Sequence, residues 1–200
     1  MAELPEITLD PRRVQDFLME QFDPAAHDVA LIGAGAWSCC YGFGCAGQAL
    51  VVRFGRYGED FQKDRLAAAY RSPDLPIPTV LALGLAFDGF YAVSTRVDGV
   101  PLEDVGAAHW RRLAPALAGA LEALRTVDLA ATRGFGGWDG TGAAVFPSWS
   151  AALLAVGDDA PDRRTHGWRA RLEHFLDAAA AFRWGHARLG QLAIDAVPRS

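Results

Sequence analysis

The chain has 200 residues, of which 51% are hydrophobic and 22% are charged. A chain of this length can form one domain, or two small lobes, with a substantial hydrophobic core. The composition is too apolar for an intrinsically disordered chain. Lys and Arg number 19 against 24 Asp and Glu, which gives a net charge of −5 without a basic run. The charge therefore argues against a nucleic-acid partner.

The N-terminal segment has no basic-then-apolar signal pattern, and no run approaches the roughly 18 apolar residues of a membrane-spanning helix. We therefore expect a cytoplasmic protein with no membrane partner. In that compartment Cys39, Cys40 and Cys45 would be reduced thiols. Their spacing lacks the paired C-x2-C of zinc sites, so we interpret them as packing residues.

In chain order, the first half of the sequence predicts a helix, three strands, a second helix and two further strands. The first helix is indicated by apolar residues that share one helical face between Arg12 and Phe22. Gly and Asp-Gly turns separate the strand-like runs. The remaining elements are expected at 29–32, 39–44, 50–54, 59–70, 79–86 and 90–96. The predicted fold class is α+β: residues 1–97 form a five-stranded antiparallel sheet with one inserted helix.

After Gly99 the strand signals stop and helical patterns follow. A tryptophan and four leucines recur at intervals of three and four residues, which predicts a helix over 107–127 with a kink at Pro115. A glycine-rich loop follows at 132–142, with further helical faces at 149–156 and 168–192. The change near Asp98 marks a lobe boundary and assigns residues 98–200 to an incomplete helical lobe.

The turn Gly33-x-Gly35-x-x-Ser38 is the first candidate site, because glycines let backbone N–H groups approach phosphate oxygens. A dinucleotide-binding oxidoreductase would require a helix from about Trp37, but the residues that follow favour a strand. An ordinary tight hairpin is the alternative that the pattern leaves open.

A glycine-rich hairpin over a nucleotide, as in kinase-like folds, also needs a basic residue on the third strand and an acid on the next helix. Arg53 occupies the first place, and Asp64 or Asp60 the second.

Several runs stand in a specific order along the chain: GAGAWSCCYGF, LVVRFG, EDFQKDR, LPIPTVLALG, YAVSTRVDGVPLEDV and GFGGWDG. Together they resemble the N-terminal part of the aminoglycoside phosphotransferase family, nearest to its hygromycin B phosphotransferase-like branch. The resemblance implies a protein-kinase-like, two-lobed fold. It also implies an antibiotic-resistance transferase that moves the terminal phosphoryl group of ATP or GTP, with Mg²⁺, to an aminoglycoside hydroxyl.

The resemblance assigns roles to particular residues. The glycine turn would lie over the phosphates, Arg53 would replace the lysine that contacts them, Asp64 would orient Arg53, and the hinge backbone would meet adenine. The nucleotide-binding residues are then Gly33, Gly35, Ser38, Arg53, Asp64, Thr95 and Val97. In the glycine-rich loop, Trp138 and Asp139 are candidates for substrate contact.

The family's catalytic Asp lies in a later H-G-D or H-A-D loop, followed by an Asn and by an I-D-W segment that holds magnesium. None of these motifs occurs in the 200 residues, and His186-Ala187-Arg188 fits a helix better. We therefore expect no catalytic and no metal residue here, a truncated chain that is inactive alone, and exposed helical faces available for self-association. The alternative is a short non-catalytic module that binds a nucleotide or a partner.

Overall fold

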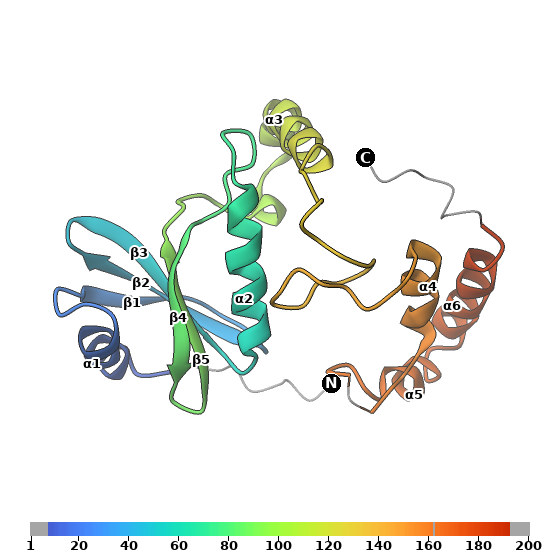
Figure 1. Cartoon of the computed structure of the whole chain (residues 1–200), viewed down its shortest axis with the longest axis horizontal. Helices are drawn as coiled ribbons and strands as arrows, with labels where there is room; N and C mark the ends of the chain where they lie inside the picture. Colours follow the sequence, from blue (N-terminus) through green and yellow to red (C-terminus); the bar gives the residue numbers. More distant parts are fainter. Residues whose placement is uncertain (1–7, 162, 193–200) are drawn as a thin grey trace. The chain divides into compact units, whose positions relative to one another are not determined.

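The computed structural model describes residues 8–161 and 163–192 (Figure 1). Its contacts divide the chain into two compact units, Met1–Asp128 and Leu129–Ser200. The first unit contains α1 (Pro11–Gln21), β1 (His27–Ala34), β2 (Ser38–Cys45), β3 (Gln48–Gly55), α2 (Gly58–Ala67), β4 (Val80–Ala86), β5 (Gly89–Thr95) and α3 (Ala107–Arg125). The second contains α4 (Trp149–Leu154), α5 (Trp168–Leu172) and α6 (Leu176–Leu189). The lobe boundary expected near residue 98 stays a prediction.

The five strands form one antiparallel sheet in the order β1-β2-β3-β5-β4. Short turns join β1 to β2, β2 to β3 and β4 to β5, whereas the connection from β3 to β4 contains α2. At the β2–β3 turn, Ala46 and Gly47 both have positive φ, of 49° and 76°. This backbone matches the twist of the two strands that it joins. The predicted five-stranded α+β fold is confirmed.

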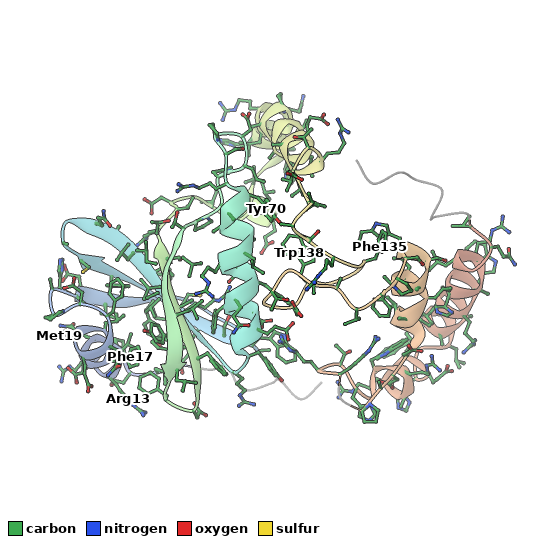
Figure 2. All side chains as sticks on the ribbon, viewed as in Figure 1. Arg13, Phe17, Met19, Tyr70, Phe135 and Trp138 are labelled. Atoms are coloured by element: carbon green, nitrogen blue, oxygen red, sulfur yellow. The ribbon has the colours of Figure 1, made fainter. Side chains whose placement is uncertain are left out.

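One face of the sheet packs against α1. In β3 the alternate residues Leu50, Val52 and Phe54 are buried on this face. From α1, the ring of Phe17 lies 5.6 Å from that of Phe54 and 5.0 Å from that of Tyr91, centroid to centroid (Figure 2). Side chains alternate along a strand, so the intervening residues of β3 point to the opposite face.

That opposite face is covered by α2, which contacts β4 and β5 (Figure 1). Phe61 anchors the helix, because its side chain is almost completely buried. A Cβ at Gly55 would lie 3.2 Å from the tip of the Phe61 ring, so the glycine lets helix and sheet approach closely. This packing fixes α2 above Val51 and Arg53, the outward residues of β3.

The helix-rich part of the chain differs from expectation in one place. A helical face was predicted over 168–192, but the helix is interrupted between α5 and α6. There the backbone of Phe175 is not helical, with φ −115° and ψ 83°, and its N–H donates to Leu172 O in a tight turn. The predicted long helix at 107–127 is present as α3, which continues through Pro115. Among the described helices, none combines the length and the apolar character that crossing a membrane requires.

Candidate functional site

Arg53 of β3 and Asp64 of α2 form an ion pair on the α2 face of the sheet, with Arg53 Nη2 donating to Asp64 Oδ2. The guanidinium carbon of Arg53 also lies 4.7 Å from the centroid of the Phe61 ring. The side chains of Arg53 and Asp64 are 33% and 46% exposed, so water still reaches both charges. Such a pair contributes little to folding stability, and its main consequence is a fixed orientation of the guanidinium group.

Two cavities adjoin at this ion pair. The first has a volume of about 350 Å³ and mostly apolar walls from four strands, from α2 and from the segment before β4. The second has a volume of about 280 Å³ and lies between the start of β2 and α2. Arg53 and Asp64 line both cavities. The other lining residues are Cys40, Val51, Ala67, Ile77, Pro78, Val80, Ala92 and Ser94 for the first, and Trp37, Ser38, Gly55, Tyr57, Asp60, Phe61 and Lys63 for the second.

The glycine turn joins β1 to β2 and is closed by Gly35 N, which donates to Ser38 O at 3.0 Å. β2 begins at Ser38, so the helix that a dinucleotide-binding turn requires is absent here and the oxidoreductase alternative is excluded. A Cβ at Gly33 or Gly35 would meet no heavy atom of the described residues within 4 Å, and neither glycine has a positive φ. Neither packing within the described chain nor backbone conformation therefore explains these two glycines.

The predicted hinge residues lie at the end of β5. Thr95 is tied to Thr79 twice: its N–H donates to Thr79 O, and its Oγ1 accepts from Thr79 N, each at 3.0 Å. The N–H of Thr95 is therefore already used inside the first unit. Val97 follows the strand and is exposed. The assignment of both residues to nucleotide binding stays a prediction.

The two substrate candidates lie in the second unit. Asp139 Oδ1 accepts hydrogen bonds from Thr141 N at 2.8 Å, Thr141 Oγ1 at 2.7 Å and Ala143 N at 3.1 Å. Its carboxylate thus holds the glycine-rich loop in shape, a role that requires no ligand. Trp138 precedes it in the same loop (Figure 2). Contact of either residue with a substrate stays a prediction.

His186 belongs to α6, as the sequence indicated, and not to a loop. Its Nε2 lies 2.8 Å from Leu154 O, and its ring stacks on Phe182 with a centroid distance of 5.7 Å. A Cβ at Gly157 would come within 2.6 Å of the same Nε2. The imidazole is thus part of the packing of α6 against the end of α4.

Sequence analysis missed part of the apolar cavity. Cys40 was interpreted as a packing residue together with its two neighbours, but only Cys39 and Cys45 are buried and Cys40 lines the cavity. Partial burial raises the pKa of the Cys40 thiol, and the positive charge of Arg53 opposes this shift. The only signal in the sequence was strand alternation, which places Cys40 on the same face as Arg53.

Ile77 and Pro78 were missed because nothing local shows that their segment folds back over the sheet. Within the described residues, no three His, Cys, Asp or Glu side chains come together in a way that could hold a metal ion.

Comparison with known proteins gives one consistent result, although no family model matches the chain. The chain is 28% identical over 179 residues to a hygromycin-B 4-O-kinase of Escherichia coli, an alignment that covers 88% of this chain and 50% of the relative. The chain is also similar to a crystal structure of a thermostable mutant of aminoglycoside phosphotransferase APH(4)-Ia, a ternary complex with AMP-PNP and hygromycin B. The superposition has a TM-score of 0.73 at 27% sequence identity, and it covers 84% of this chain and 56% of that chain.

A second crystal structure of aminoglycoside phosphotransferase APH(4)-Ia superposes with a TM-score of 0.69 at 30% identity, covering 74% of this chain and 50% of that one. The chain thus spans about half the length of the relatives that it matches.

Proposed function

Because the chain belongs to the aminoglycoside phosphotransferase family, we propose that its first unit binds the nucleoside triphosphate, ATP or GTP, that donates a phosphoryl group to an aminoglycoside hydroxyl. The observation that carries this proposal is the common border of the two cavities at Arg53 and Asp64. One cavity is apolar and the other is lined by charged side chains, as a nucleotide with a flat base and a charged tail requires.

In this arrangement the base lies in the apolar cavity, against Val51 and Ala92 of the sheet. The phosphates lie in the second cavity, where Ser38 brings the end of the glycine turn to the site. The absence of a Cβ at Gly33 and Gly35 leaves room for phosphate oxygens to approach the backbone N–H groups. A bound nucleotide thus supplies the reason for these glycines that the described chain does not.

Because Arg53 lines both cavities, its positive charge would lie between the base and the phosphates of the nucleotide. Asp64 binds one of its terminal nitrogens and Phe61 covers its face, so the remaining N–H groups are held in a fixed direction. A guanidinium group presents a planar set of donors that matches two phosphate oxygens at once, whereas a lysine presents a point charge. We propose that Arg53 neutralises phosphate charge and that Asp64 orients it.

Phosphoryl transfer depends on positioning and on charge neutralisation, which the family assigns to a catalytic Asp and to magnesium ligands. Neither motif occurs in the 200 residues. We therefore propose that this chain supplies nucleotide binding and that the transfer step needs the half of the fold not represented here. Magnesium would arrive with the triphosphate and reduce its charge. We place this activity in the cytoplasm, in resistance to an aminoglycoside antibiotic.

Isothermal titration with MgATP tests the proposal. The unaltered chain should bind, and Arg53→Ala should weaken binding about tenfold or more, because hydrogen bonds to charged groups contribute about 1.5–3 kcal/mol. Arg65→Ala is the matched control, since Arg65 lies on the same helix as Asp64 but is exposed and lines neither cavity. Absence of binding by the unaltered chain, or equal effects of the two substitutions, contradicts the proposal.

A further inference from the structure

The side chain of Arg96 turns back over the sheet after the end of β5. The sheet register aligns Gly42 with Val51 and Val51 with Ser94 across three strands. Residues paired directly across antiparallel strands point to the same face, and Val51 and Ser94 line the apolar cavity. A Cβ at Gly42 would point to that face as well and would meet Arg96 Nη1 at 2.8 Å. The guanidinium group of Arg96 therefore lies on the cavity face, one strand away from Val51.

Two hydrogen bonds hold Arg96 in this place, and they leave the terminal N–H groups of its guanidinium available as donors. Its backbone N–H donates to Ala49 O at 3.2 Å, and its Nε donates to Asp98 Oδ1 at 3.0 Å. Among the described residues, its terminal nitrogens have no hydrogen-bond partner. Beside them lies Ile32 of β1, whose Cγ2 would be 3.3 Å from the same added Cβ. Two free nitrogens thus lie over β2, next to the apolar cavity.

The path of a bound nucleotide crosses this place. With the base against β3 and β5 and the phosphates at the turn between β1 and β2, the ribose that joins them must lie against the cavity face of β2, the face on which the Arg96 guanidinium group lies. Ribose hydroxyl oxygens accept hydrogen bonds, and guanidinium N–H groups donate them. We propose that a terminal nitrogen of Arg96 donates to a ribose hydroxyl of the bound nucleotide, an inference that rests on the proposed nucleotide-binding function.

The same geometry gives Gly42 a specific purpose. Any side chain at position 42 would bring its Cβ within 2.8 Å of Arg96 Nη1, which is closer than van der Waals contact allows. The guanidinium group would then have to shift from the position in which it faces the ribose. Gly42 is therefore the residue that makes room for Arg96.

The experiment compares the affinities for MgATP and for the magnesium complex of 2′,3′-dideoxyATP, which lacks both ribose hydroxyls. The unaltered chain should bind ATP about tenfold more tightly than the dideoxy analogue. Arg96→Ala should bind the two nucleotides equally, and Gly42→Ala, which displaces the guanidinium group, should reduce the preference. Asp98→Ala removes the ion pair that holds the guanidinium group but keeps the group itself, so it should lower the preference for ATP less than Arg96→Ala does. Thermal melting of each variant identifies any loss of folding.

The results of this experiment distinguish failure of the ribose contact from failure of nucleotide binding. A chain that binds ATP with no preference over the analogue, or an Arg96→Ala variant that keeps the preference, overturns the ribose contact and leaves nucleotide binding intact. Equal loss of preference in Arg96→Ala and Asp98→Ala shows that Arg96 acts only as a structural tie, which also overturns it. A chain that binds neither nucleotide overturns both proposals.

Discussion

Arg53 and Asp64 lie eleven residues apart in the chain, on β3 and α2, and their ion pair marks the border at which an apolar and a charged cavity meet. The pair is partly exposed. Asp64 therefore matters most for the direction in which Arg53 presents its donors, and only slightly for the stability of the fold.

Asp64→Asn tests whether Asp64 contributes to nucleotide affinity more than to the stability of the fold. The substitution removes the charge that orients Arg53, so we expect MgATP affinity to fall several-fold while the free energy of unfolding changes by about 1 kcal/mol or less. Titration calorimetry and urea unfolding measure the two quantities. Glu122→Gln is the control, since Glu122 pairs with Arg125 on α3 and neither residue lines the two cavities. A large loss of stability with unchanged affinity would contradict the assignment.

Leu18→Ala tests the core on the other face of the sheet. Leu18 of α1 is fully buried, and its truncation should lower the free energy of unfolding by about 2–5 kcal/mol. Met19→Ala, one residue later on α1 (Figure 2), should have little effect, because the exposed fraction of Met19 is 42%. Chemical denaturation monitored by tryptophan fluorescence gives both values. Equal destabilisation by the two substitutions would show that α1 does not pack as described.

Cys40 should report occupancy of the apolar cavity. Iodoacetamide, mapped by mass spectrometry, should modify Cys40 before Cys39 and Cys45, which are buried. MgATP should slow that reaction if the base fills the cavity. Equal labelling of Cys40 with and without saturating MgATP would place the nucleotide elsewhere.

The pH dependence of this alkylation follows from the pKa of the Cys40 thiol, which burial raises above its ordinary value. Because the thiolate is the reactive form, the rate should still be rising with pH above about 8.5, where a free thiol is half ionised. The rate for a cysteine-containing peptide, which should level off at lower pH, is the reference. A Cys40 rate that levels off before that of the peptide would contradict the shift.

Self-association through α3 remains a prediction from the sequence. Every residue of α3 is at least partly exposed, and Leu117, Leu121 and Leu124 lie along one face. Leu121→Glu should lower the apparent mass seen by light scattering at high protein concentration. Arg112→Glu, on the opposite face of the helix, should not. A monomer at all concentrations would end this expectation.

Hydrophobic periodicity was sufficient to predict the strands and most helices. In α1, β2 and β3 the apolar face is buried, whereas α3 has the same helical periodicity on residues that are all at least partly exposed. Alternation along β3 also placed Arg53 and Val51 on the face opposite the core. The break at Phe175 could not be predicted, since it depends on a tight turn that no glycine or proline marks. Neither could the closing of the cavity by Ile77 and Pro78, or the return of Arg96 over Gly42, because both depend on contacts between distant segments.

The central claim is that the first unit binds a nucleoside triphosphate across the Arg53–Asp64 border. Amide NMR of the ¹⁵N-labelled chain during titration with MgATP tests it residue by residue. We predict that the largest shifts occur at Gly33, Gly35 and Ser38 in the turn, and at Arg53 and Ser94 beside the apolar cavity. Saturating MgATP that leaves these amides unmoved, or that moves only amides of the second unit, would contradict the account.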